Sequence, residues 1–275
     1  MAFHHARHNR ACVGLDPVTE RLPESLRARH GDDLRALWRA FLFPVVECLA
    51  ARAAAFKPNW AFFLAGGLDG MSALGELCNY LHQRAPEALL VLDMKVGDIQ
   101  STNQGYVRHA FDHLGADAVT VHPYLGSEAL EPFLSRADRG VFVLGRTSNP
   151  GGAELQALEV SDGGAPEPLY LHLARRVAGP WNLHGNTGLV VGATTPEPLR
   201  RVRAVAPALP LLIPGVGAQG GDLDGTLRAA FSVEGAGPIL VNQSSGILYA
   251  DPGSAWLSAA ERVYSTFDAS LRAAG

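Results

Sequence analysis

Eight short apolar runs recur along the chain, and they constrain its fold more than any other feature. Each run is rich in valine, leucine, isoleucine or alanine, and each is continuous rather than alternating with polar residues. Continuous apolar runs are typical of strands that are buried on both faces. We therefore expect eight buried strands, at residues 11–15, 54–58, 89–95, 118–122, 140–145, 188–193, 211–216 and 238–243.

The segments between these strands have the spacing of amphipathic helices. Apolar residues recur at helical intervals over residues 34–42 and again over residues 71–81. Pro44 is expected to kink or end the first of these helices. Because strand and helix alternate about eight times, the pattern predicts a parallel sheet.

Closure of that sheet gives the predicted fold class, an α/β protein with a single (β/α)8 TIM barrel. A doubly wound open sheet is the alternative, but it calls for a glycine fingerprint after the first strand, and VGLDPVTE supplies none. We expect one catalytic domain over residues 1–275, with residues 1–10 as a mobile tail. The long segment 146–168 is expected to be a lid or a binding loop.

Composition argues against several classes of protein. The chain of 275 residues has a net charge of −4 and no basic run interleaved with aromatic residues, so we expect no nucleic-acid partner. No apolar run approaches the roughly 18 residues of a membrane span, and the first residues have no apolar signal core. The three cysteines match no disulfide or metal motif, which predicts reduced thiols in a cytoplasmic protein.

Charged side chains gather where the predicted strands end. Asp16 follows the first strand, Lys57 ends the second, Asp93 and Lys95 end the third, and His122 ends the fourth. The carboxyl ends of the strands carry the active site in barrels of this kind. Taken singly, each residue is more often a solvated loop residue or half of an ion pair. For Asp16 and His122 alone, the structural interpretation is favoured.

The combination of these residues favours a functional role. Asp93 and Lys95 are separated by one residue of a strand, so their side chains point the same way. Buried charges must pair, and alternating lysines and aspartates stabilise each other's charged forms. An ammonium group held at an apolar barrel mouth can act as a positioned cation and a proton donor. Asp98 follows shortly after, where an acid can also simply cap the next helix.

A glycine-rich stretch, PGVGAQGGD at residues 214–222, follows the seventh predicted strand. Glycines let the backbone approach a ligand closely, and this stretch leads into a predicted helix over residues 222–231. A glycine loop that feeds a helix N-terminus is an anion site, and barrels commonly bind phosphate after their last two strands. For Gly220 and Gly221, a tight turn between strand and helix is the structural alternative.

The segment DMKVGDIQST resembles the D-x-K-x-x-D-I-x-x-T signature of the orotidine 5′-phosphate decarboxylase family. The resemblance extends to GLDP at Asp16, FKPN at Lys57, RTSNPG after the fifth strand and PGVGAQGGD after the seventh, and it covers about residues 11–250. It favours the bacterial subgroup with longer chains. The D-x-K-x-x-D core is shared with sugar-phosphate decarboxylases and synthases, but Lys57 and Gln219 favour the orotidylate enzymes.

This resemblance implies decarboxylation of orotidine 5′-monophosphate to UMP and carbon dioxide, with no metal and no organic cofactor. Lys95 would stabilise the anion that forms at pyrimidine C6 and donate its proton, and Asp93 would lie beside the substrate carboxylate. Lys57 would orient the network. The other implied contacts are Asp16 with the ribose hydroxyls, Ser148 with the pyrimidine amide, and Gln219 with the neighbouring Pro214, Gly215 and Gly220 at the phosphate.

The same resemblance implies a homodimer with shared active sites. In the family, the second aspartate and the threonine of the signature enter the site of the partner subunit. The corresponding residues of this chain are Asp98 and Thr102.

One position departs from the family pattern. Where the family has an arginine that pairs with phosphate after the eighth strand, the chain reads VNQSSGILYA, with Ser245 at the equivalent position. A hydroxyl cannot replace the bidentate clamp of a guanidinium. Arg146 and Arg108 are the candidate replacements.

Two alternatives to the decarboxylase stay open on these grounds. A related sugar-phosphate decarboxylase or lyase would depend on a divalent metal. A barrel that binds a phosphate ligand without catalysis is the second alternative, and Ser245 is its motivation. The set of paired lysines and aspartates argues against it, because a buried charge cluster is costly to keep.

Overall fold

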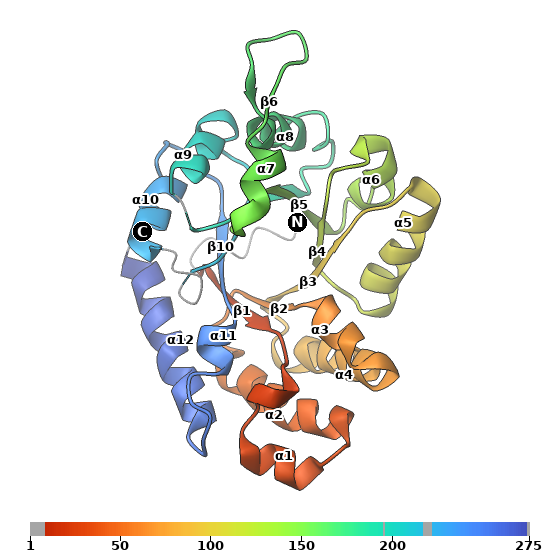
Figure 1. Cartoon of the computed structure of the whole chain (residues 1–275), viewed down its shortest axis with the longest axis vertical. Helices are drawn as coiled ribbons and strands as arrows, with labels where there is room; N and C mark the ends of the chain where they lie inside the picture. Colours follow the sequence, from red (N-terminus) through yellow and green to blue (C-terminus); the bar gives the residue numbers. More distant parts are fainter. Residues whose placement is uncertain (1–8, 195, 217–221, 274–275) are drawn as a thin grey trace.

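A computed structural model of the chain describes residues 9–194, 196–216 and 222–273 (Figure 1). In these residues, eight parallel strands close into a barrel in the order β1-β10-β9-β8-β5-β4-β3-β2. The predicted TIM barrel is thus confirmed, and the open-sheet alternative is wrong. The strands are β1 (Ala11–Leu15), β2 (Ala55–Pro58), β3 (Leu89–Val96), β4 (Ala118–Val121), β5 (Gly140–Arg146), β8 (Thr187–Val191), β9 (Leu211–Pro214) and β10 (Ile239–Gln243).

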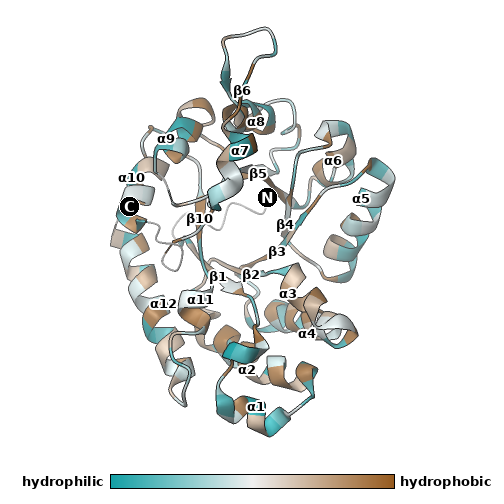
Figure 2. Cartoon of the chain, viewed as in Figure 1, coloured by the Kyte–Doolittle hydropathy of each residue, from teal (hydrophilic) through white to brown (hydrophobic). Residues whose placement is uncertain are grey.

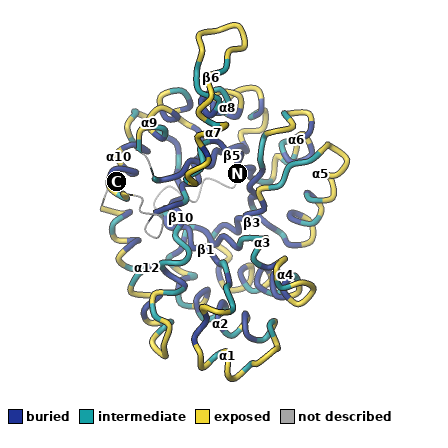
Figure 3. Tube along the Cα trace, in the orientation of Figure 1, coloured by how far each residue is buried: buried dark blue, intermediate teal, exposed yellow. Residues whose placement is uncertain are grey.

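Helices surround the barrel, with their apolar faces toward the strands (Figures 1 and 2). The strands are buried and the outer faces of the helices are exposed (Figure 3). The outer helices are α1 (Glu24–His30), α2 (Leu34–Leu49), α3 (Trp60–Ala65), α4 (Gly67–Arg84), α5 (Gln100–Val107), the π-helical turn η3 (Arg108–His113), α6 (Gly126–Leu134), α8 (Leu169–Ala178), α9 (Pro196–Val205), α10 (Leu223–Ala230) and α12 (Trp256–Ala273).

Short elements occupy the connections at the carboxyl ends of the strands. A 3₁₀ turn, η2 (Thr19–Arg21), follows β1, and the short helix α11 (Ser245–Leu248) follows β10. The expected loop at 146–168 contains η4 (Pro150–Gly152), α7 (Ala153–Gln156) and an antiparallel pair, β6 (Glu159–Val160) and β7 (Glu167–Pro168). This hairpin projects away from the barrel (Figure 1).

Pro44 does not end the first amphipathic helix, although such an end was one of the two outcomes expected there. Helix α2 continues to Leu49 with Pro44 inside it. A proline in a helix interior costs about 3 kcal/mol. Val45, Val46 and Leu49 lie beyond the proline and are buried in the core, so their packing offsets that cost. The second predicted helix is confirmed as α4.

Two apolar layers hold the barrel. The larger lies between the strands and the helices. The smaller fills the barrel interior with one or two side chains from each strand: Cys12, Ala55, Leu89, Val91, Ala118, Phe142, Val190, Leu212 and Leu240. Side chains alternate along a strand, so residues two positions further along also face the barrel axis, nearer its carboxyl end.

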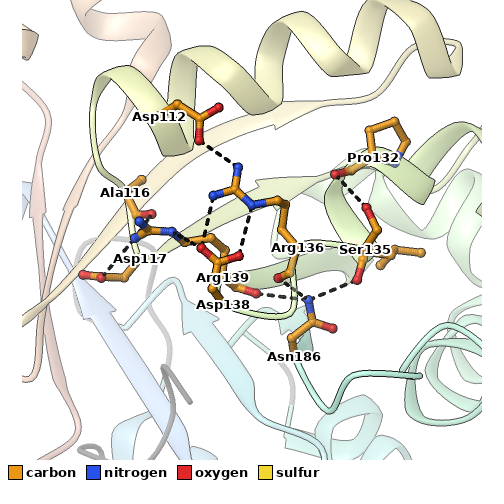
Figure 4. A network of polar contacts seen from close by, with 10 residues as sticks. Asp112, Ala116, Asp117, Pro132, Ser135, Arg136, Asp138, Arg139 and Asn186 are labelled. Atoms are coloured by element: carbon orange, nitrogen blue, oxygen red, sulfur yellow. Dashed lines mark hydrogen bonds and ion pairs between the residues drawn. The ribbon is translucent and has the colours of Figure 1, made fainter.

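The opposite end of the barrel, where the strands begin, carries a polar network (Figure 4). Arg136, just before β5, forms ion pairs with Asp112 and Asp138 at 2.8 and 3.0 Å. The Nδ2 group of Asn186, just before β8, lies 3.0–3.2 Å from the carbonyl oxygens of Leu134, Arg136 and Arg139. We call these residues the base network. They tie together the loops that start β5 and β8.

The expected N-terminal tail is only partly described by the structure. Of the tail expected at residues 1–10, residues 1–8 lie outside the described part of the chain. Arg10 is held in place, because its guanidinium donates to the carbonyl of Leu271 at 3.0 Å and lies over the ring of Phe231.

None of the helices in the described residues is long and apolar enough to cross a membrane.

Candidate active site

The alternation of the strands places the polar residues of the mouth. Ala55 and Val91 face the barrel interior, and two positions later come Lys57 on β2 and Asp93 on β3. In the same way, Ala118 is followed by Thr120 on β4, and Leu240 by Asn242 on β10. These four polar residues therefore form the next layer above the apolar interior, and all are buried.

Asp93 is the centre of the array. Its Oδ2 accepts a hydrogen bond from Lys57 Nζ at 2.6 Å, and its Oδ1 accepts from Lys95 Nζ at 2.5 Å. Thr120 Oγ1 also donates to Asp93 Oδ1, at 2.7 Å. The expectation that Asp93 and Lys95 point the same way is confirmed. Both carboxylate oxygens are satisfied, as a buried charge requires.

The electrostatics of the pair follow from its burial. Burial alone would raise the pKa of Asp93, but the two lysine ammonium groups outweigh it and hold that pKa well below its usual range. Burial alone would lower the pKa of Lys57, but Asp93 and then Asp16 outweigh it and raise that pKa. Both groups are therefore charged at neutral pH.

Lys95 has an unusual backbone. Its φ is 50°, and it is the one non-glycine residue in the described part of the chain with a positive φ. Such a conformation costs about 1–3 kcal/mol and clusters at functional sites. The regular pairing of β3 with β4 shifts between Leu92 and Val96. The Lys95 N–H instead donates to Thr120 Oγ1 at 3.0 Å, so Thr120 positions both Asp93 and Lys95.

A second polar group joins β1 to β10. Ser244 Oγ donates to Asp16 Oδ2 at 2.6 Å. This approach requires Gly14, because a Cβ there would lie 2.4 Å from Ser244 Cβ. Tyr249 donates to the carbonyl of Asp16 at 2.8 Å and accepts from the N–H of Val18 at 2.7 Å. The other carboxylate oxygen of Asp16 is buried and has no partner among the described residues.

A cavity of about 670 Å³ opens above these groups. Its volume suits a small-molecule ligand, since such sites range over about 300–1,000 Å³. Among its described lining residues are Asp16, Lys57, Asp93, Lys95, Ser148, Pro214, Gly215 and Ser245, all of which the sequence predicts as site residues. Gly215 has a φ of 99°, which favours glycine at this turn.

Other predicted residues lie elsewhere. Asp98 and Thr102, at the start of α5, do not line this cavity in the described chain. Gln219 and Gly220 fall on residues 217–221, outside the described residues. The helix expected after them is confirmed as α10.

The two candidate replacements for the missing arginine are not part of the cavity wall. Arg146 donates to the carbonyl of Thr147 at 2.6 Å, and Arg108 is exposed on η3. Neither is among the described lining residues. His122 also lies outside the lining, with its Nδ1 accepting weakly from Tyr124 N–H at 3.4 Å, in line with the structural interpretation.

Sequence reasoning missed several residues of the site, among them Arg21, Thr120, Asn242, Ser244 and Tyr249. The threonine in AVTVH is only a weak signal for Thr120, because a single threonine in a strand is ordinary. A stronger signal was also present for the lysines, because Lys57 and Lys95 are the only lysines in the whole sequence. Ser244 and Tyr249 carry no comparable signal, since their partners Asp16 and Val18 follow β1 and are brought near only by barrel closure.

No group of three or more His, Cys, Asp or Glu residues is arranged to hold a metal ion in the part of the chain that the structure describes. All three cysteines are free; Cys12 and Cys78 are buried and Cys48 is half-buried.

The comparisons with known proteins agree with this geometry. A sequence model of the orotidine 5′-phosphate decarboxylase / HUMPS family matches residues 9–259. An orotidine 5′-phosphate decarboxylase from Roseiflexus sp. (strain RS-1) is 48% identical over 257 residues, which cover 93% of this chain and 90% of the relative.

Solved structures are similar as well. The OMP decarboxylase of Leishmania donovani is 38% identical with a TM-score of 0.80, over 98% of this chain and 96% of that one. The UMP synthase of Leishmania donovani is 41% identical with a TM-score of 0.80, over 96% of this chain but 55% of that one. Sequence, fold and site agree, and the chain belongs to the orotidine 5′-phosphate decarboxylase / HUMPS family.

Proposed function

We propose that this chain decarboxylates orotidine 5′-monophosphate to UMP and carbon dioxide in pyrimidine synthesis, without a metal or an organic cofactor. One observation carries the proposal. A buried aspartate holds two lysines at the floor of a cavity large enough for a nucleotide. Membership of the family supports the same substrate.

Lys95 is the residue that meets the reacting carbon. Loss of carbon dioxide leaves an electron pair on pyrimidine C6 with little delocalisation, so a nearby positive charge lowers the barrier. The Lys95 side chain is 46% exposed toward solvent, whereas that of Lys57 is 4% exposed. A ligand in the cavity can therefore reach Lys95 directly. Lys95 then donates a proton to C6 and completes the product.

Asp93 and Lys57 position the Lys95 side chain before the substrate binds. Asp93 holds the Lys95 ammonium at 2.5 Å, and Lys57 is bonded to the other oxygen of Asp93. Because this network is fixed before the substrate arrives, no reorganisation is needed during the reaction. The substrate carboxylate would lie beside Asp93. As neutral carbon dioxide leaves, the negative charge of that carboxylate moves to C6, where the Lys95 ammonium stabilises it and then protonates it.

The rest of the cavity binds the nucleotide. The buried, unpartnered oxygen of Asp16 suits a ribose hydroxyl, which would supply the missing donor. We assign Ser148 to the pyrimidine amide. The phosphate would lie near Pro214, Gly215 and Ser245, at the ends of β9 and β10. Gln219 and Gly220 are assigned to it from the resemblance alone.

A homodimer with shared sites is part of the proposal. The Asp98 backbone is fixed by Asn103, whose Nδ2 donates to the Asp98 carbonyl at 2.7 Å and whose Oδ1 accepts from its N–H at 3.1 Å. Ile99, just before α5, and Tyr124, just before α6, are 58% and 80% exposed. Exposed apolar residues beside fixed polar ones favour contact with a second copy. Asp98 and Thr102 would then enter the partner's cavity.

Location is proposed on separate grounds. The three free cysteines suit a reducing compartment, and the proposed reaction belongs to central metabolism, so we assign the protein to the cytoplasm.

The activity is tested by following the ultraviolet absorbance of orotidine 5′-monophosphate with the purified protein in EDTA. We expect turnover by the wild type and none by Lys95→Ala. Arg108→Ala is the matched control, since it removes an exposed cation outside the cavity. Absence of wild-type turnover at high substrate concentration would reject the proposed reaction. Turnover of a sugar phosphate that EDTA abolishes would favour the metal-dependent relatives instead.

The shared site is tested by mixing two inactive variants, Lys95→Ala and Asp98→Ala. A heterodimer with shared sites contains one site in which both residues are intact. An equal mixture should therefore regain up to about a quarter of wild-type activity. If the mixture stays inactive although the chains exchange, Asp98 does not act across an interface.

A further inference from the structure

We propose that Arg21 binds the phosphate of the substrate. It would replace the arginine that the family has after the eighth strand, where this chain has Ser245. The inference rests on the proposed function, because it names a residue of that same nucleotide site. It starts from the charges of the cavity wall.

Three cations are among the described lining residues of the cavity: Arg21, Lys57 and Lys95. Both lysines are bonded to Asp93, and they lie at the ends of β2 and β3. Arg21 belongs to η2, after β1, and its side chain forms no ion pair with a carboxylate in residues 9–194, 196–216 and 222–273. Its positive charge is therefore available to an anion.

Arg21 is also held in position. Its guanidinium carbon lies 4.1 Å from the centre of the Tyr249 ring. Tyr249 is itself fixed at its hydroxyl, which bonds to the backbone of Asp16 and Val18. A guanidinium that stacks on an aromatic face keeps its N–H groups free at its edges, where they can bind a phosphate in bidentate fashion. Arg21 is exposed, and its contact with the Tyr249 ring restricts the side chain before a ligand binds, which lowers the entropy cost of binding.

The stack lies on the side of the barrel where the phosphate is expected. The N–H of Tyr249 donates to the carbonyl of Ser245 at 3.1 Å, so Tyr249 lies one helical turn beyond Ser245 along the chain. Strands β1 and β10 are neighbours, and the bond from Ser244 to Asp16 joins their following loops. Barrels commonly bind phosphate after their last two strands, here β9 and β10. Arg21 thus reaches this region from β1 rather than from β10.

The experiment compares binding of UMP with binding of uridine, which lacks the phosphate, by titration calorimetry. We expect Arg21→Gln to weaken UMP binding at least about tenfold and to leave uridine binding unchanged. Arg21→Lys should weaken UMP binding less, because it keeps the charge and loses the fork. Arg29→Gln, an exposed arginine on the nearby α1, is the matched control and should change neither ligand.

A second variant tests whether a cation supplied from β10 can replace Arg21. Adding Ser245→Arg to Arg21→Gln should restore most of the UMP affinity, because it supplies a cation from β10. Equal losses for UMP and uridine would overturn the inference, since Arg21 would then act only by holding Tyr249. So would a loss of UMP affinity no larger than that of Arg29→Gln, or no UMP binding by the wild type.

Failure of the proposed reaction gives a different result. A wild type that binds UMP through Arg21 but does not turn over orotidine 5′-monophosphate would reject the reaction and keep the phosphate site.

Discussion

The mouth of the barrel, at the carboxyl ends of the strands, buries its pair of charged side chains, whereas the base leaves its charged pair partly exposed. At the mouth, Lys57 and Asp93 have side chains only 4% and 7% exposed and are bonded to each other at 2.6 Å. Figure 4 shows the ion pair of Arg136 with Asp112 at the base. The side chains of this pair are 26% and 49% exposed. Buried pairs are expensive to desolvate and exposed pairs contribute little either way. The costly charges therefore gather where the chemistry is proposed.

The backbone shows the same contrast. At the mouth, Lys95 adopts a positive φ and interrupts the pairing of β3 with β4. At the base, Asn186 satisfies loop carbonyls and keeps the starts of β5 and β8 together. Strain is tolerated at functional sites when the surroundings fix it. We therefore assign function to the mouth and stability to the base, and mutations at each end test these assignments.

The largest expected effect on stability comes from Asp93→Asn. This change leaves Lys57 buried without its counter-charge, and breaking a buried pair costs about 3–5 kcal/mol of unfolding free energy. Activity should be lost as well, because Lys95 loses its anchor. Urea unfolding at neutral pH measures the cost. A loss below about 1 kcal/mol would mean that the pair is far better solvated than its burial indicates.

The same pair predicts a pH dependence. The pKa of Lys57 is raised in the folded state, so its stabilisation is complete below the unfolded value of about 10.4 and is lost as pH rises through the folded value. The pKa of Asp93 is lowered, so its stabilisation is complete above about pH 3.9 and is lost as pH falls through its folded value.

This dependence can be observed directly. Since the sequence has only two lysines, carbon-13 labelling of the lysine ε-carbon should give two NMR signals in the folded protein. We expect the signal of Lys57 to show no titration below about pH 10.4, and Asp93→Asn to move its titration to lower pH. Titration of Lys57 near pH 8 in the wild type would contradict the electrostatic account.

At the base, Asn186→Ala should cost about 1–3 kcal/mol, because it leaves buried carbonyls without a donor. Asn186 is 2% exposed, so water cannot readily replace the amide. The kcat of the proposed reaction should stay within about twofold of the wild type, as the base lies at the opposite end of the strands. A large drop in kcat with little loss of stability would break the division between the two ends.

A smaller difference in stability is expected between Lys95→Gly and Lys95→Ala. Glycine adopts a φ of 50° without a steric penalty, so Lys95→Gly should be more stable than Lys95→Ala by about 1 kcal/mol. At an ordinary strand position the order would be reversed. Thermal unfolding of the two variants decides between these orders, and the reversed one would show that Lys95 is not strained.

The smallest effect is expected from Arg136→Gln. Its ion pairs with Asp112 and Asp138 are partly exposed, and such pairs contribute about 0.2–1 kcal/mol. Salt should reduce the difference from the wild type further. A cost above about 2 kcal/mol would place the base network among the buried pairs and weaken the contrast with the mouth.

Sequence reasoning succeeded where one local signal was sufficient. Strands buried on both faces leave continuous apolar runs, so all eight barrel strands were predicted to within a few residues. The array of Lys57, Asp93 and Lys95 was predicted because charges at strand ends stand out. Of the two outcomes expected at Pro44, the helix end is wrong, because the packing of Val45, Val46 and Leu49 outweighs a local penalty.

The rest of the site depends on contacts between distant segments. Thr120 was missed because a single threonine in a strand is ordinary until its neighbour on β3 is known. Arg21 was missed because nothing near it in the sequence indicates that the Tyr249 ring will lie beneath it. Such contacts arise only when the barrel closes and brings β1 beside β10.

The most direct test of the account follows the carboxylate carbon itself. Orotidine 5′-monophosphate labelled with carbon-13 at the carboxylate is incubated in EDTA with the wild type and with Lys95→Ala, and carbon-13 NMR records the label. We predict that the wild type releases the label as carbon dioxide and bicarbonate, one for each UMP formed, and that Lys95→Ala is slower by at least about 10⁴-fold. Release by Lys95→Ala at a rate close to that of the wild type would contradict the central role of the mouth lysine.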